Sequence, residues 1–541
     1  MAFRPVIFAV AALAVLGTGC LSSEGGTDKD GQGGVATADC LAGVAGLDLN
    51  QASLRQLQDA LTAGNVTSVQ LVQAYAARVA AFDAVGGQGP QLNSVREVSA
   101  TALAQAAALD AERAAGSVRG PLHGIPILLK DNIGTFDEPT TAGSIALAAN
   151  VPPVDATMTA SLREAGMVIL GKTNLSEFAN WVDLSMPNGY SSLGGQVVNA
   201  YTGGDPSGSS SGSGVAGSMA FAAITIGTET SGSILGPSDA NSLVGVKPTV
   251  GLVSRAGIIP LAANFDTPGP MGRHVEDVAL VLGAVAGPDP LDPATAASAS
   301  HLPAGNDYVA RLSPHGLQGV RLGYDPNDDG ELFTRALDDL RAAGADLVAI
   351  DRDQLDSVSV TELAFIFNEF KFGINDYLAN QAGPGLPVTD LTGIILYNRD
   401  HPDQVKYGQN LLIASDAQSG DFVTAQFAAT PTILSARAIA DRFFANVDAI
   451  VGPSLSYVSI GAAAGYPTVI VPAGYDEHDP QGISFFGPAW SEADLLVYAY
   501  AYEQHSLRRE SPTTITPTLL DGVCGSSTSK TSTSAPAARF D

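Results

Sequence analysis

Three of the seven lysines lie within apolar sequence: Lys130 in ILLKDNI, Lys172 in VILGKTNL and Lys247 in VGVKPTV. Lysine is almost never fully buried without a partner, and burial favours its neutral form. A neutral lysine is a base, so it can activate a serine where other hydrolases use histidine. For Lys172 and Lys247 we favour a structural role, in which the amine caps backbone carbonyls.

A serine-rich run, DPSGSSSGSG, occupies residues 205–214. Its composition is typical of a flexible linker. Residues 208–212 also satisfy G-x-S-x-G, the nucleophile elbow of α/β-hydrolases, but that motif needs an apolar strand before it. The preceding residues, NAYTGGDPS, do not form a strand core, and His274 and His505 show no special context as partners. We therefore expect neither a linker nor an elbow here.

Residues 166–173, GMVILGKT, match the phosphate-binding loop pattern letter for letter. The apolar MVIL predicts a strand, whereas a phosphate cradle needs a loop with inward-facing amides. The seven histidines are scattered, and no paired His, Cys or carboxylate spacing suggests a metal site. We expect no cofactor and no metal.

The chain has 541 residues, 45% of them hydrophobic and 15% charged, with a formal net charge of −28. This composition predicts a folded protein with a large core. The negative charge argues against nucleic acid or an anionic membrane surface as a partner. Between the two ends we see neither repeats nor a second linker, so a single domain over residues 46–512 is the simplest prediction. The sequence does not indicate an oligomeric state.

Residues 1–20 have the basic start, apolar stretch and small-residue end of an export signal. Cleavage before Cys20 would resemble bacterial lipoprotein processing, although Leu16 lies one place too early for the usual pattern. We favour a lipid anchor on Cys20, in the periplasm or at the outer membrane. Release as a soluble secreted protein is the alternative.

Two polar segments flank the predicted domain. Residues 21–45 predict a Gly-rich tether and residues 513–541 a disordered Ser/Thr-rich tail. Cys40 and Cys524 lie at the two ends of the folded region. Export permits a disulfide between them, and two free thiols are the alternative.

The pattern of elements predicts an α/β fold. Residues 69–80 have helical spacing behind a Thr67/Ser68 cap, and residues 100–116 are rich in alanine. Short apolar runs predict seven strands, at residues 125–130, 167–171, 223–229, 320–324, 346–350, 448–452 and 468–472. We expect a mixed, mostly parallel twisted central sheet covered by helices, with a helical excursion over residues 353–446.

Several long segments together resemble the amidase signature hydrolases. They are GPLHGIPILLKDNI (120–133), DPSGSSSGSGVAG (205–217), AITIGTETSGSILGPSDANSLVGVKPTVGLVSR (223–255) and DTPGPMGRHVEDVALVL (266–282). GYPTVIVPAG (465–474) and FFGPAWSEADLLVYAYAYEQ (485–504) extend the resemblance, which covers residues 48 to 512. GSSSGS, LGKTNLSEFAN and EFKFGINDYL are closest in style to bacterial peptide amidases.

The resemblance implies a Ser–cis-Ser–Lys triad of Ser233, Ser209 and Lys130. Ser233 would be the nucleophile, Ser209 the bridge that relays the proton, and Lys130 the base and then the acid. The bond between Gly208 and Ser209 would be cis. The implied oxyanion hole consists of the backbone amides of Thr230, Ser231, Gly232 and Ser233.

The implied activity is hydrolysis of a linear carboxamide, such as the C-terminal amide of a peptide, to an acid and ammonia. Ser231 and Leu235 depart from the family's usual glycine and arginine, and Ser211 replaces a usual glycine, so we expect an altered substrate pocket. The alternatives are an esterase or arylacylamidase on the same triad, and a non-catalytic exported binding protein. Export and negative charge argue against action on charged tRNA.

Overall fold

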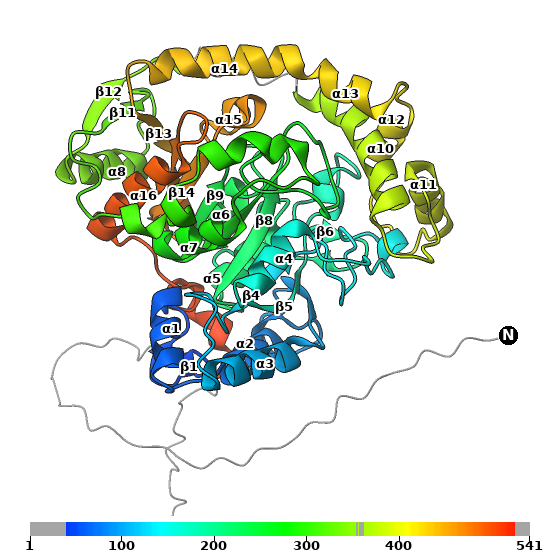
Figure 1. Ribbon diagram of the computed structural model, residues 1–541, viewed down its shortest axis with the longest axis horizontal. Coiled ribbons are helices and arrows are strands. Elements are labelled where there is room, and N and C mark those ends of the chain that lie inside the picture. Colours follow the sequence, from blue (N-terminus) through cyan, green and yellow to red (C-terminus); the bar gives the residue numbers. More distant parts are fainter. Residues whose placement is uncertain (1–38, 353–354, 356–361, 525–541) are drawn as a thin grey trace, which may run out of the picture. The chain divides into compact units, whose positions relative to one another are not determined.

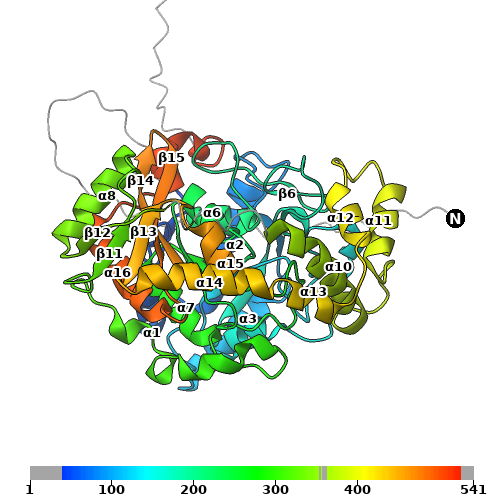
Figure 2. The same cartoon turned by 90° about the horizontal axis from the view of Figure 1, so that it is seen from above.

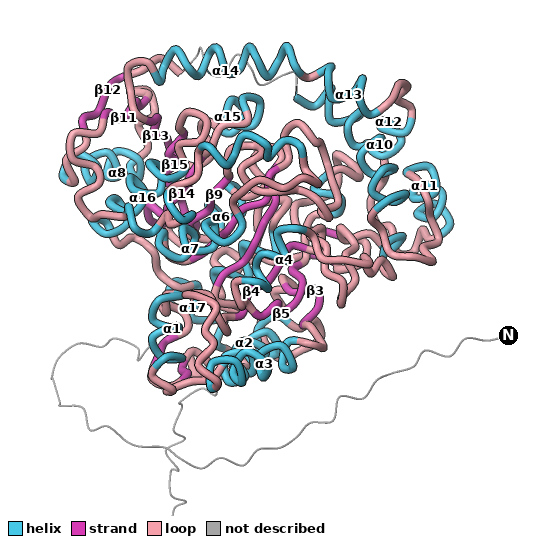
Figure 3. The backbone as a smooth tube through the Cα atoms, viewed as in Figure 1, coloured by secondary structure: helices cyan, strands magenta, loops and turns pink. Residues whose placement is uncertain are grey.

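The computed structural model describes residues 39–352, 355 and 362–524. In this part of the chain, eleven strands form one sheet with helices around it (Figures 1 and 3). From one edge to the other the strands are β12 (Asp346–Ala349), β11 (Arg321–Tyr324), β13 (Ala449–Pro453), β15 (Asp479–Phe486), β14 (Thr468–Asp476), β9 (Val244–Lys247), β10 (Thr267–Gly272), β8 (Ile224–Glu229), β4 (Pro126–Lys130), β5 (Val168–Thr173) and β3 (Val95–Val98).

The α/β class is confirmed, and all seven predicted strands are present, as β4, β5, β8, β11, β12, β13 and β14. The expectation of a mostly parallel sheet is wrong. Six of the ten strand pairings in the described sheet are antiparallel and four are parallel. The difference comes from β3, β9, β10 and β15, which we did not predict and which all pair antiparallel.

The described chain contains sixteen α-helices. They are α1 (Leu54–Thr62), α2 (Ser68–Arg78), α3 (Ala102–Ala114), α4 (Thr157–Glu164), α5 (Ser211–Ser218), α6 (Leu235–Ala240), α7 (Val275–Val285), α8 (Glu331–Ala342), α10 (Glu362–Asn380), α11 (Leu391–Asp400), α12 (Asn410–Asp416), α13 (Phe422–Ala428), α14 (Thr430–Phe444), α15 (Val458–Ala464), α16 (Glu492–Ser506) and α17 (Pro512–Ile515).

Local sequence explains the helices that we predicted. The Thr67 side chain accepts a hydrogen bond from the amide of Gln70, and the Gln70 side chain accepts one from the amide of Thr67, so a capping box starts α2. Helices α2 and α3 pack on β4 and β5, and α5 and α7 pack on β10. Helices α10 to α14 occupy the range of the predicted helical excursion, and α14 runs beside α15 (Figure 2).

The Gly/Ser run is a structured turn that leads into the buried helix α5 rather than a linker. Every residue of α5, from Ser211 to Ser218, is buried. A Cβ atom on Gly212 would lie 2.3 Å from the carbonyl oxygens of Asn174 and Ser94, so only glycine lets these backbones approach. The elbow interpretation is excluded as well, because β8 follows α5 and no strand leads directly into it.

The folded region extends beyond both predicted boundaries. Residues 43–44 and 47–48 pair as the short strands β1 and β2, inside or beside the segment assigned to the tether. Helix α17 and a 3₁₀ turn at Pro517–Leu520 lie within the segment assigned to the disordered tail. The ordered chain therefore runs at least to Cys524. Residues 1–20, including Cys20, lie outside the described residues.

Within the described chain, no helix combines the length and the hydropathy that a membrane crossing requires.

Candidate active site

Lys130 ends strand β4, which lies between β5 and β8 at the centre of one half of the sheet. Its side chain is completely buried. The amine nitrogen Nζ lies 2.8 Å from Oγ of Ser209, 2.9 Å from Oγ1 of Thr228 and 3.2 Å from the carbonyl oxygen of Thr228. Parallel pairing of Leu129 with Ile226 places the end of β4 beside Thr228.

Burial lowers the pKa of Lys130 to about 7, although the carboxylates of Asp266 and Glu229 act in the opposite direction. A neutral amine has two hydrogens and one lone pair. The Thr228 carbonyl oxygen can only accept a hydrogen bond, so one amine hydrogen points to it. The other hydrogen and the lone pair face two hydroxyls, Thr228 Oγ1 and Ser209 Oγ, each of which can accept or donate.

Ser209 lies in the turn that leads into α5. The peptide bond between Gly208 and Ser209 is cis. The Ser176 amide donates to the Ser209 carbonyl at 3.1 Å, and the Ser210 amide donates to the Ser233 carbonyl at 3.3 Å. These bonds hold the turn between the chain that follows β5 and the loop that follows β8.

Ser233 lies in that second loop, between β8 and α6. One carboxylate oxygen of buried Glu229 accepts hydrogen bonds from the amides of Ile234 at 2.7 Å and Leu235 at 2.9 Å. Glu229 thus fixes the loop just beyond the four residues of the expected oxyanion hole. Gly232 has φ +83°, a conformation that favours glycine. Ser233 is 7% exposed, whereas Lys130 and Ser209 are fully buried. Among the described residues, the Ser233 hydroxyl makes no hydrogen bond.

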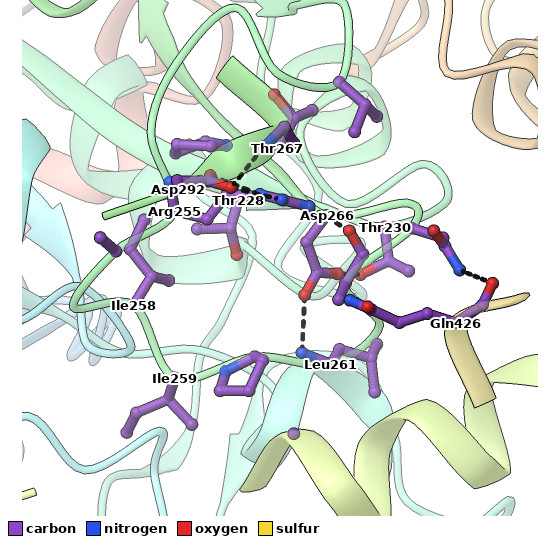
Figure 4. A pocket seen from close by; sticks show the side chains of 18 of the residues that line it. Thr228, Thr230, Arg255, Ile258, Ile259, Leu261, Asp266, Thr267, Asp292 and Gln426 are labelled. Carbon is purple, nitrogen blue, oxygen red and sulfur yellow. Dashed lines mark hydrogen bonds and ion pairs between the residues drawn. The ribbon is translucent and has the colours of Figure 1, made fainter. Parts of the chain in front are cut away.

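A cavity of about 710 Å³ lies next to this cluster. Figure 4 shows side chains that line the cavity. Thr228, Thr230 and Asn132 form its wall on the side of the serines and the lysine. Apolar side chains supply much of the remaining wall, among them Ile258, Ile259, Leu261, Leu291, Phe422, Ile433 and Trp490. A volume of this size accommodates a ligand larger than a simple amide.

Two of the charged side chains in the cavity wall, Arg255 and Asp292, form an ion pair with each other. The guanidinium of Arg255 contacts Asp292 through two nitrogens, Nε at 2.8 Å and Nη2 at 2.7 Å. Such paired contacts fix the orientation of an arginine and neutralise its charge. The described residues include no cluster of three or more His, Cys, Asp or Glu side chains that could hold a metal ion.

The other two lysines in apolar sequence have the structural role that we predicted. The amine of Lys172 donates to the Ile133 carbonyl at 2.6 Å and to Oγ1 of Thr140 at 2.8 Å. The amine of Lys247 donates to the Tyr466 carbonyl at 2.6 Å. The pattern at residues 166–173 falls on β5 and is not a phosphate-binding loop.

The two cysteines at the ends of the folded region form a disulfide. The sulfur atoms of Cys40 and Cys524 are 2.11 Å apart and their Cα atoms 5.6 Å apart. His274 lies at the start of α7, where Nε2 is 2.9 Å from the Gln51 carbonyl. Burial lowers its pKa to about 4. Its Nε2 is thus engaged by the Gln51 carbonyl, and no hydrogen bond of the described chain joins His274 to a serine of the Gly/Ser run.

Sequence reasoning did not single out three residues of this site: Thr228, Glu229 and Asp266. Each is a common polar residue type. Thr228 and Glu229 are the last two residues of β8, and Asp266 directly precedes β10. The available signal was the segment GTETSGS, whose acidic and hydroxyl side chains directly precede Ser233. Their contacts depend on strand register, which a single sequence does not reveal.

The chain belongs to the amidase signature family. Its fold and this site are therefore those of an amide-hydrolysing enzyme. The sequence model of that family, described as Amidase, matches residues 70–460. A probable amidase of Arabidopsis thaliana is 38% identical over 481 residues, which cover 86% of this chain and 92% of the plant protein.

Two solved structures are similar to this one over most of its length. The peptide amidase of Stenotrophomonas maltophilia has 41% identity and a TM-score of 0.78, over 85% of this chain and 98% of that chain. An amidase family protein of Bacillus anthracis has 35% identity and a TM-score of 0.80, over 86% and 92%.

Proposed function

We propose that this enzyme hydrolyses the C-terminal carboxamide of peptides through an acyl-enzyme on Ser233. The observation that carries the proposal is the 2.8 Å contact between the buried amine of Lys130 and the Ser209 hydroxyl. A lysine with a pKa near 7 is a base at neutral pH. The Ser210–Ser233 backbone bond brings the bridging turn and the nucleophile loop together.

The first half of the reaction forms an ester. Ser233 Oγ attacks the carboxamide carbon while its proton passes to Ser209, and the Ser209 proton passes to Lys130. Amides of residues 230–233 stabilise the oxyanion, a contribution of about 3–4 kcal/mol per donor in other enzymes. The carbon–nitrogen bond then breaks, and the proton returns from Lys130 through Ser209 to the leaving nitrogen, which departs as ammonia.

The second half repeats these steps with water. Water attacks the ester carbon and gives its proton to Ser209, while Lys130 again takes the proton of Ser209. When the ester bond breaks, the relay returns a proton to Ser233 Oγ and releases the acid. The balance is one amide and one water consumed, and one acid and one ammonia formed.

Two observations support a peptide amide as the substrate. The cavity of about 710 Å³ has apolar walls that suit the side chains of a short peptide. The similar structure from Stenotrophomonas maltophilia is that of a peptide amidase.

The test measures ammonia release from N-acetylated dipeptide amides, with acetamide, anilides and methyl esters of the same acyl groups for comparison. We expect the highest kcat/KM on the peptide amides. Adding hydroxylamine should divert part of the product to a hydroxamate, because the acyl-enzyme can transfer its acyl group to that nucleophile. Faster ester turnover without ammonia release would instead identify an esterase.

Ser233→Ala is the matched variant, since it removes one oxygen from a residue that makes no side-chain hydrogen bond in the described structure. We expect loss of both ammonia and hydroxamate with an unchanged melting temperature. Activity at the wild-type level in the purified variant would remove Ser233 as the nucleophile.

A further inference from the structure

Asp266 lies just before β10, directly across from Thr230. Strands β8 and β10 are antiparallel, and Thr267 pairs with Glu229. The same register places the preceding residue of β10, Asp266, opposite the residue that follows β8, Thr230. Antiparallel neighbours at such positions are within reach of one another's side chains.

The carboxylate of Asp266 joins two segments of the cavity wall (Figure 4). Its Oδ1 accepts a hydrogen bond from the Thr230 hydroxyl at 2.5 Å. Its Oδ2 accepts from the amides of Leu261 at 2.8 Å and Ala262 at 2.9 Å. Thr230 is the first residue of the expected oxyanion hole, so one side chain connects the hole to the loop of residues 261–264, which also lines the cavity.

The same loop is also held from the side of the helical excursion. Asn264 donates its backbone amide to one oxygen of Glu369 at 2.9 Å and its side-chain amide to the other at 2.8 Å. It also donates to the Gln426 carbonyl at 2.8 Å. Helices α10 and α13 therefore support the loop that carries Asp266, which makes its position well determined.

Asp266 also acts on the pKa of Lys130 through its charge. The two carboxylates whose charge acts on Lys130 are Asp266, before β10, and Glu229, at the end of β8. Asp266 in turn faces Arg255, whose charge is paired with Asp292, and Glu369 on α10. A negative charge near an amine favours its protonated form.

We propose that Asp266 is a positioning residue that holds Thr230 in the oxyanion hole and supplies part of the negative field at Lys130. This inference rests on the proposed function. It gives Asp266 two separable effects: a hydrogen bond that acts on kcat, and a charge that sets the pH at which Lys130 becomes a base.

Two variants separate these effects. Thr230→Val keeps the shape of the side chain and removes only its hydrogen bond to Asp266. Asp266→Asn removes the charge but can keep the contacts, because its carbonyl oxygen can accept from the Leu261 and Ala262 amides while its NH₂ group donates to the Thr230 hydroxyl. Asp277→Asn is the control, since Asp277 is a buried carboxylate on another part of the sheet's cover, α7, and it accepts a bond from the Leu54 amide.

For Thr230→Val we expect kcat on a peptide amide to fall about tenfold, with KM changed less than about threefold, because the lost contact acts on the transition state. The acid limb of its pH profile should stay in place. For Asp266→Asn we expect kcat on the plateau of the pH profile to stay within about threefold of wild type, because Thr230 keeps a hydrogen-bond partner. Its acid limb should move about one unit to lower pH, since Lys130 loses a stabilising charge.

Several results would overturn the proposal. One is a kcat within twofold of wild type for Thr230→Val, which is a valid test even if Asp266→Asn does not fold. Another is an acid limb for Asp266→Asn that coincides with that of Asp277→Asn. Ser233→Ala, measured alongside, separates the two claims. If it is inactive while Asp266→Asn and Thr230→Val behave as wild type, only the role of Asp266 fails. If it is active, the triad and this inference fail together.

Discussion

The strongest prediction concerns the pH at which the enzyme becomes active. The relay needs Lys130 as a neutral amine, and the pKa of this buried group is about 7. Neutral lysine increases as pH rises, so activity must rise with pH. At pH 6 about one amine in ten is neutral and at pH 8 about nine in ten, so kcat/KM should increase roughly tenfold over this interval.

The assay is ammonia release from an N-acetylated, C-amidated aliphatic dipeptide between pH 5 and 9. This substrate has no group that titrates in that range, so kcat/KM reports on the free enzyme. Circular dichroism at each pH checks that the protein stays folded. Lys130→Met should be inactive throughout, because methionine has similar length but no basic nitrogen.

Two outcomes would refute the reasoning. A kcat/KM that is flat from pH 6 to 8 would mean that no base with a pKa near 7 limits the reaction. A limb centred between pH 4 and 5 would identify a carboxylate instead of the amine. In either case Lys130 would not be the proton acceptor.

Three further variants test other parts of the structure. Ser209→Ala should lower kcat by about 10²- to 10⁴-fold without changing the melting temperature, since it removes the proton relay; a loss below tenfold would contradict that role. Lys172→Met should leave kcat of the folded enzyme within threefold but lower the free energy of unfolding by about 1–3 kcal/mol, measured in urea, because the Ile133 carbonyl loses its donor; wild-type stability would show that the lysine is dispensable. Cys40→Ser with Cys524→Ser should cost about 2–4 kcal/mol of stability with unchanged kcat, and an unchanged urea midpoint would show that the disulfide adds nothing.

Continuous apolar runs made seven strands predictable, because strands buried on both faces contain few polar residues. Strand β10 gave no such signal. Its sequence, TPGPMG, contains Pro268 and Pro270, which lack amide hydrogens and read as a loop. It is nevertheless a central strand, between β9 and β8. The two prolines are tolerated because β9 pairs with this strand only at Met271 and Gly272, beyond both prolines.

The candidate site, like the sheet, was predictable only in part. An apolar setting marked Lys130 as a buried base, and the resemblance implied Ser209 and Ser233. The partners Thr228 and Asp266 were not predictable, because their roles follow from the register of β8 with β4 and β10. Lys130 and Asp266 are far apart in sequence, and the sheet alone brings them to the same place.

The disulfide between Cys40 and Cys524 has a consequence for the integrity of the chain. It joins residues separated by 484 positions, so nearly all of the folded chain is a covalently closed ring. Cutting one peptide bond in a surface loop of this ring opens it without dividing the molecule. The segments that carry Lys130 and Ser233 then stay linked through the remaining path, either the chain between them or the disulfide. Only a cut together with reduction, or a second cut, separates them.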